Sequence, residues 1–145
     1  MPFNFQVVVD CAQPHILAGW WAEALGWNVE HQDPDFIRSM IDQGLASEAD
    51  TITHKGKLVW GEAAAIRHPD DEGPNPLRRV LFQTVPEPKT VKNRLHLDVR
   101  TGADALESER ARLEAMGATY LYTGTQGPHS WITMTDPEGN EFCVG

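Results

Sequence analysis

The stretch DPEGNEFCV, residues 136–144, decides how the last part of the chain folds. Pro137 presets one turn dihedral, and Gly139 and Asn140 tolerate the positive φ that a tight turn requires. The residues that follow are strand formers, so the stretch predicts a turn that leads into a short final strand. The stretch NRLHLDV, residues 93–99, lies about forty residues earlier and predicts a second strand of the same half.

Working outward, the two halves of the chain show the same order of patterns. A β-branched strand pattern is followed by a helical pattern that ends at Gly26 in the first half and at Gly117 in the second. Gln6 precedes Gly26 by 20 residues and His96 precedes Gly117 by 21, which favours an internal duplication. The predicted elements are strands at 3–11, 27–32, 58–67, 79–85, 94–100, 120–123, 130–135 and 141–144, and helices at 15–25 and 103–116.

Two segments of the first half depart from this regular order. Residues 33–57 carry weak signals, from which we expect one short helix that begins near Asp33 and ends before Gly44. Residues 58–67 are expected to form one strand in which Gly61 marks a bulge. The sequence therefore predicts an α+β fold of tandem βαβββ modules in a single domain, residues 1–145, with module 1 at about 1–87 and module 2 at about 91–145.

Composition excludes several classes of function. The 12 Lys and Arg against 21 Asp and Glu give a formal charge of −9, which works against binding of nucleic acid. No apolar run approaches the roughly 20 residues that cross a bilayer, so we expect no membrane association. Two cysteines far apart in sequence, Cys11 and Cys143, fit a reduced cytoplasmic protein better than a secreted one.

The DPEGN turn, the pair Trp20-Trp21, and the stretches LFQ (81–83), VPEPK (85–89) and NRLHLD (93–98) together resemble one family. They are similar to glyoxalase-like proteins of the vicinal oxygen chelate superfamily, which also contains bleomycin-resistance proteins and dioxygenases. The resemblance implies that each module curls its sheet into half of a cup, that the cup encloses a ligand pocket, and that the chain forms a homodimer.

The resemblance also implies where a metal would bind. In metal-dependent members the ligands come from the first and last strands of each module, and these positions fall on Gln6, Gln83, His96 and Cys143. Cys143 stands where the family commonly has a ligating Glu, and amide oxygens bind metals weakly. The cofactor is therefore expected to be either none or a divalent metal held by Gln6, His96 and Cys143.

Further residues are candidates for the pocket or for support of its ligands. Asp98 follows His96 by two residues on a strand and could orient it, and Glu141 shares a strand face with Cys143 and could replace it as a ligand. The alternatives to metal binding are a hydrogen-bonded pocket histidine for His96 and a small buried side chain for Cys143. The residues predicted to line the ligand pocket are Gln6, Trp60, Phe82, Gln83, His96, Trp131 and Cys143, with Phe142 as a further aromatic candidate.

Three functions remain open from the sequence. The first is a metal-free protein that binds a small-molecule ligand in the cup. The second is a metal-dependent lyase, isomerase or dioxygenase with a reduced ligand set around His96. The third is an interaction module that pairs as a homodimer.

Overall fold

The computed structural model describes residues 1–145, which divide into two compact units, Met1–Pro86 and Glu87–Gly145. Each unit is described by itself. Unit 1 contains β1 (Val7–Cys11), α1 (Pro14–Leu25), β2 (Asn28–Val29), α2 (Pro34–Asp42), a 3-10 turn (Glu48–Asp50), β3 (Thr51–His54), β4 (Lys57–Trp60), β5 (Ala63–Arg67) and β6 (Arg79–Thr84). Unit 2 contains β7 (Leu97–Val99), a 3-10 turn (Ala103–Ala105), α3 (Leu106–Ala115), β8 (Thr119–Gln126), β9 (His129–Thr135) and β10 (Glu141–Val144).

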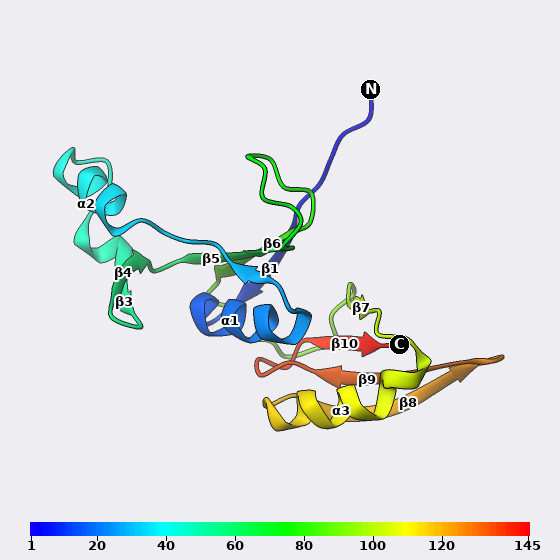
Figure 1. Ribbon diagram of the computed structural model, residues 1–145. Helices are drawn as coiled ribbons and strands as arrows, with labels where there is room; N and C mark the ends of the chain where they lie inside the picture. The colour runs from blue at the N-terminus through cyan, green and yellow to red at the C-terminus, as the bar shows by residue number, and fades with distance from the viewer. The chain divides into compact units, whose positions relative to one another are not determined.

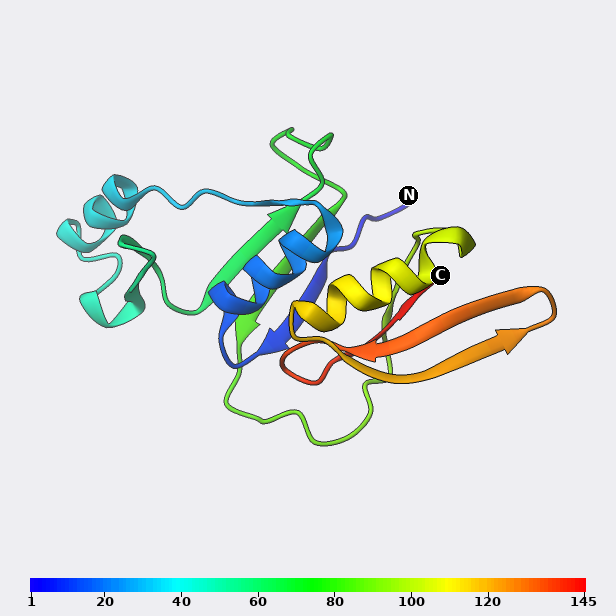
Figure 2. The same cartoon turned by 60° about the horizontal axis from the view of Figure 1, so that its bottom comes forward.

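The main sheets of the two units have the same topology. The strand order is β1-β6-β5-β2 in unit 1 and β7-β10-β9-β8 in unit 2. In each sheet the first strand pairs in parallel with the last, and the remaining neighbours are antiparallel. The helix that follows the first strand lies along its sheet in both units (Figures 1 and 2). The duplicated βαβββ organisation predicted from the sequence is therefore confirmed, and the fold class is α+β.

Helix α1 illustrates how local sequence and packing agree. Pro14 occupies its first turn, where a missing N–H costs nothing. Gly26 ends it in the left-handed region at φ 68°, which lets its N–H return to the carbonyls of Ala22 and Glu23. The buried side of the helix, which includes Leu17 and Trp21, packs on β5 and β6.

Each sheet buries one face and leaves the other open. In unit 1 the buried residues of β5 and β6 alternate with less buried ones, as the period of two in a strand requires. Unit 2 shows the same alternation in β10, where Phe142 and Val144 are buried beside Ile132 and Met134 of β9 and Leu113 of α3. The open faces are therefore the faces on which a ligand can be held.

The predicted strand 3–11 is shorter in the structure, because it can extend only as far as its partner. Val7 pairs with Val80, and only one residue of β6, Arg79, precedes Val80, so β6 has no partner residues for Phe3 to Phe5. Phe3 and Phe5 are consequently 91% and 86% exposed. The first strand of unit 2 is shortened in the same way, so His96 precedes β7 by one residue.

The predicted single strand 58–67 is wrong, because the chain changes sheets within it. Residues before Gly61 form β4, which pairs with β3 in a separate two-stranded sheet, and residues after Glu62 form β5 of the main sheet. Helix α2, the 3-10 turn and the β3–β4 hairpin are thus an insertion between β2 and β5, visible in cyan and blue-green in Figure 1. The short helix expected near Asp33 is confirmed as α2.

Side chains fasten this insertion to the rest of unit 1. The Gln32 amide accepts from the Trp60 N–H at 2.8 Å and donates to the Ala63 carbonyl at 2.9 Å. His15 Nε2 donates to the Trp60 carbonyl at 2.6 Å, and the His15 and His54 rings lie 5.2 Å apart. Burial, and then the nearby His15 and Lys55, hold the pKa of His54 below its ordinary value of 6.5.

We expect this histidine pair to make unit 1 less stable at acidic pH. Because the pKa of His54 is lower in the folded state, its contribution is complete above about pH 6.5 and is lost as the pH falls through the folded pKa. His54→Gln should therefore show a smaller drop in melting temperature between about pH 7.5 and pH 5.5 than the wild type. The exposed His31→Gln is the control, and an unchanged drop in His54→Gln would contradict the expectation.

Candidate functional site

The open face of the unit 2 sheet forms a groove of about 580 Å³. Its floor comes from residues of β10, β9 and β8 that alternate with the buried core, and one side comes from β7. The polar and aromatic side chains that line it include His96, Asp98, Arg100, Tyr122, Trp131 and Cys143. Three residues of the pocket predicted from the sequence, His96, Trp131 and Cys143, therefore lie along one groove.

Strand register explains why three potential ligand groups gather in this groove. Asp98 and Cys143 are direct partners in the parallel pair of β7 and β10, and His96 lies two residues before Asp98. The His96 imidazole and the Asp98 carboxylate are 3.3 Å apart, and the ligand atoms of His96, Asp98 and Cys143 all lie within 4.8 Å of one another. Thr133 Oγ1 lies 3.5 Å from the Cys143 sulfur. We call His96, Asp98 and Cys143 the His96 cluster.

The His96 cluster fits a divalent metal in its donor set. Imidazole, carboxylate and thiolate are all zinc ligands, and three protein ligands with one open position is the usual pattern of a catalytic zinc. Bonds of about 2.0–2.3 Å would place the ligand atoms roughly 3.3–3.8 Å apart, so small side-chain rotations would be needed. The His96 and Asp98 side chains are 40% and 73% exposed, which leaves them free to make those rotations.

Asp98 adds a carboxylate to the candidate ligand atoms of His96 and Cys143. From the sequence, Asp98 is expected only to orient His96. Its spacing of two residues from His96 is the signal that could have identified it as a ligand, because such residues share one strand face.

Trp131 lies against a strand position that has no side chain. Gly124 is its partner on β8, and a Cβ built on Gly124 would lie 2.3 Å from two indole carbons of Trp131. The indole therefore lies directly over the glycine, and an aromatic surface is held at the groove. The neighbouring Tyr122 also lines the groove.

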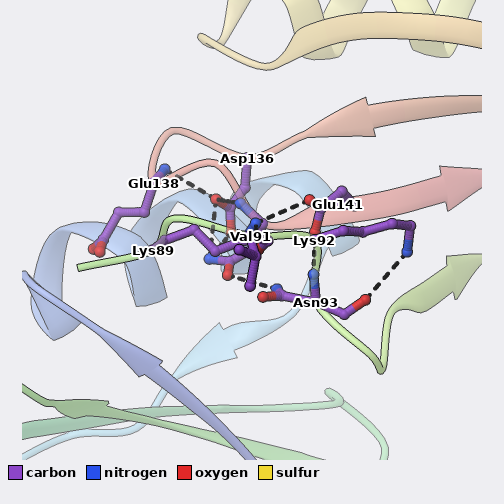
Figure 3. Close-up of polar contacts among 8 residues, drawn as sticks. Lys89, Val91, Lys92, Asn93, Asp136, Glu138 and Glu141 are labelled. Atoms are coloured by element: carbon purple, nitrogen blue, oxygen red, sulfur yellow. Dashed lines mark hydrogen bonds and ion pairs between the residues drawn. The ribbon is translucent and has the colours of Figure 1, made fainter. Parts of the chain in front are cut away.

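Glu141 lines the same groove, but both of its carboxylate oxygens have partners (Figure 3). Lys89 donates to Oε1 at 2.9 Å, and the backbone N–H of Asn93 donates to Oε2 at 3.1 Å. Burial acts to raise the pKa of Glu141, but the hydrogen bonds from Lys89 and Asn93 outweigh it and leave this pKa below its ordinary value. Glu141 thus joins the segment before β7 to the final strand.

We expect loss of the Lys89–Glu141 pair to loosen this segment. Glu141→Gln keeps an acceptor but removes the charge, and should cost about 1 kcal/mol of unfolding free energy because the pair is largely shielded from solvent. Lys89→Met should cost a similar amount, and the double variant should cost less than the sum. Denaturant unfolding measures all three, and full additivity would show that the pair contributes nothing.

The other predicted site residues belong to unit 1. Gln6 precedes β1, and its side-chain oxygen accepts from Arg79 at 2.7 Å. Gln83 is exposed on β6, whereas Phe82 is buried in the core, and Phe142 of unit 2 is buried likewise. Trp60 lies on the inserted hairpin beside a second groove of about 570 Å³. A meeting of Gln6 and Gln83 with His96 and Cys143 stays a prediction.

The second groove has a different electrostatic character. Glu30 accepts from Arg67 and from Arg79, and these hydrogen bonds, that from Arg79 foremost, hold the pKa of Glu30 below its ordinary value. Asp50 and Glu62 are exposed carboxylates at the same groove. No histidine or cysteine lines it, so it offers no metal site comparable with the His96 cluster.

The paired βαβββ units and the comparisons with known proteins agree on the class of protein. The topology is that of the vicinal oxygen chelate fold, which the glyoxalase, bleomycin-resistance and dioxygenase proteins share. The chain belongs to the glyoxalase-like domain family, whose model matches residues 6–145. No curated protein sequence matches the chain.

Several solved structures share the fold at low sequence identity. A possible glyoxalase from Bacillus cereus is 10% identical with a TM-score of 0.61, covering 99% of this chain and 98% of that one. A glyoxalase/bleomycin resistance protein/dioxygenase family enzyme from Burkholderia phytofirmans is 12% identical with a TM-score of 0.60, covering 96% and 94%. An E126Q mutant of the fosfomycin resistance protein FosX from Listeria monocytogenes, complexed with Mn(II) and a dihydroxypropylphosphonic acid, is 7% identical with a TM-score of 0.63, covering 99% and 91%.

None of the helices has both the length and the apolar composition that a membrane span requires.

Proposed function

We propose that the chain is a glyoxalase-like protein that binds a small molecule on the open face of unit 2. The observation that carries the proposal is the groove of about 580 Å³ in which Trp131 and the His96 cluster face the same space. A concave site with an aromatic wall and a few polar groups is the usual form of a small-molecule site. This proposal does not require a bound metal.

Thermal stabilisation by a small-molecule library tests this proposal. A ligand that binds only the folded state raises the melting temperature, by an amount that grows with its concentration relative to Kd. Trp131→Ala should lose the shift produced by such a ligand, whereas Trp27→Ala, which changes a tryptophan of unit 1, should retain it. A ligand whose shift survives in Trp131→Ala would place binding elsewhere.

A second candidate function is that of a metal-dependent lyase, isomerase or dioxygenase. The convergence of His96, Asp98 and Cys143 favours it, and the Mn(II) complex of the FosX mutant supports it as a fold-level analogy. A metal held by this cluster would act as a Lewis acid on a ligand oxygen. Because Glu141 is already engaged by Lys89 and Asn93, it is less suited to carry a proton in such a reaction.

Metal content separates the two candidates. Protein equilibrated separately with Zn²⁺, Mn²⁺ and Co²⁺ and then desalted should retain about one equivalent of one metal if the second candidate holds. His96→Ala and Asp98→Asn should both lose that metal, and His129→Ala, which changes another histidine at the groove, is the control. If no metal is bound stoichiometrically, or if His96→Ala retains it fully, the first candidate, a metal-free binding protein, is favoured.

Two further properties belong to this proposal. Neither Cys11 nor Cys143 is part of a disulfide, which supports a function in the reducing cytoplasm. The resemblance to the superfamily supports a homodimer. Sedimentation across a concentration series tests this, and a protein that stays monomeric at the highest concentration would contradict it.

A further inference from the structure

The floor of the unit 2 groove contains a row of four residues that cross the sheet from edge to edge. Gly145 donates to the Val99 carbonyl at 2.9 Å and accepts from the Thr101 N–H at 2.8 Å, which places it directly opposite Arg100. On its other side the register of β10 and β9 continues to Trp131, and a Cβ built on Gly145 would lie 3.3 Å from the Trp131 Cβ. Trp131 in turn pairs with Gly124. The row is therefore Arg100, Gly145, Trp131 and Gly124.

This row makes a slot with two different walls. Gly145 and Gly124 contribute no side chains, so Arg100 and Trp131, which both line the groove, are the two residues of the row that carry side chains and lie on either side of Gly145. Neighbouring strands are about 4.8 Å apart, so the Cα atoms of Arg100 and Trp131 are separated by roughly 10 Å. Gly145 adds no side chain between them, which leaves space above its backbone for part of a ligand.

Two cationic side chains, Arg100 and Lys92, and two carboxylates, Asp98 and Glu141, line the groove. Arg100 lines the groove and forms no ion pair or hydrogen bond, and Lys92 lines it with only the Asn93 carbonyl as a partner. Of the two carboxylates in the groove, Glu141 is paired with Lys89 and Asp98 lies next to His96. Arg100 is therefore the cationic side chain of this groove that is left to bind a ligand.

We propose that the groove takes a small aromatic carboxylic acid, with its ring against Trp131 and its carboxylate on Arg100. A guanidinium binds a carboxylate through two parallel hydrogen bonds, and an indole offers a flat apolar face for a ring. This inference rests on the proposed function, because it names the class of ligand for the same groove.

Paired probes that differ only in charge test the inference. Naphthalene-2-carboxylate and the neutral 2-naphthol present the same ring, and isothermal titration gives the Kd of each. The wild type should bind the carboxylate about tenfold or more tightly than the naphthol, because a hydrogen bond to a charged partner contributes more than a neutral one. Arg100→Gln should remove that preference, and the exposed Arg94→Gln, outside the groove, should leave it intact.

The outcomes separate this inference from the proposed function. Equal affinity for the two probes, or a preference that persists in Arg100→Gln, overturns the recognition of an acid while binding in the groove stands. Failure of both probes to bind also overturns it, and the library test with Trp131→Ala then decides the proposed function independently. A preference that is lost in Arg100→Gln and weakens with added salt supports it.

Discussion

Replacement of Gly124 by alanine is expected to expel the Trp131 indole from its place on the sheet. The built Cβ lies 2.3 Å from two carbons of the ring, far inside van der Waals contact, and Gly124 is held in β8 by its pairing with Trp131 of β9. Either the indole must swing away or β8 must move. We expect a loss of about 2 kcal/mol of unfolding free energy, a typical cost of overpacking, and a drop of roughly 6 °C in melting temperature.

A double-mutant cycle shows whether the clash with Trp131 is the cause. In a Trp131→Ser background the same Gly124→Ala substitution should cost much less, because the ring that blocks the new methyl group is gone. Denaturant unfolding gives the free energies, and near-ultraviolet circular dichroism reports the environment of the indole. An equal cost in both backgrounds would mean that Gly124 is needed for backbone freedom alone.

Gly19 provides the matched control. It lies within α1 and a Cβ there would meet nothing within 4 Å. Gly19→Ala should therefore be neutral or should stabilise the protein by up to about 1 kcal/mol, since alanine favours the helix over glycine. The opposite signs expected at Gly124 and Gly19 distinguish a local clash from a general intolerance of larger residues.

The same row of residues shows what the sequence could reveal and what it could not. Trp131 could be chosen as a groove residue because strand alternation and its aromatic character are both visible in the sequence. Its partner could not, because the pairing of Gly124 with Trp131 depends on a register that includes a shift between Tyr120 and Tyr122. The place of Arg100 in the row depends on the pairing of β10 with β7 and with β9, so no local pattern points to Arg100.

The alternation of side chains along a strand also shows which of the predicted pocket residues of β6 can face a pocket. Phe82 and Gln83 are both predicted to line a pocket, yet adjacent residues of a strand face opposite sides. The structure places Phe82 in the core and leaves Gln83 exposed. The same reasoning separates Phe142, which is buried, from Cys143, which reaches the groove. The period of two in a strand therefore predicts that only one residue of each adjacent pair lies on the open face of its sheet.

Strand limits and the insertion were harder to predict because they depend on partners distant in sequence. Residues 3–5 have the composition of a strand, but the partner strand β6 begins at Arg79, one residue before the partner of Val7, and so cannot pair with them. The alanine-rich stretch 58–67 reads as one strand although β4 and β5 belong to different sheets. Turns and helix ends were predicted well because Pro14, Gly26 and the DPEGN turn act through their own backbone geometry.

The DPEGN turn supplies the second prediction of large effect. Asp136 is 2% exposed, and its carboxylate accepts from the backbone N–H of Glu138 and from both the backbone and side-chain amides of Asn140 (Figure 3). The Asn140 side-chain oxygen accepts in turn from Asn93 at 2.9 Å. One buried carboxylate therefore organises the turn and, through Asn140, the segment that precedes β7.

Asp136→Ala should cost about 3 kcal/mol or more of unfolding free energy. The substitution leaves several buried donors without an acceptor, and hydrogen bonds to a charged group are the costly ones to lose. Asp136→Asn should cost less, because an amide oxygen can still accept from some of these donors. Denaturant unfolding measures both, with the exposed Glu87→Ala as a control that should change stability by less than about 0.5 kcal/mol.

The effect of Asp136→Ala should also reach the groove. Strand β10 begins directly after the turn, lies between β7 and β9, and carries Cys143 opposite Asp98. A turn that no longer fixes the start of β10 lets the register at Cys143 fluctuate, so hydrogen exchange of the β10 amides should accelerate more than exchange in α1 of unit 1. Equal acceleration in both elements would mean that the turn stabilises the chain globally, and unchanged exchange in β10 would remove the turn as the anchor of the final strand.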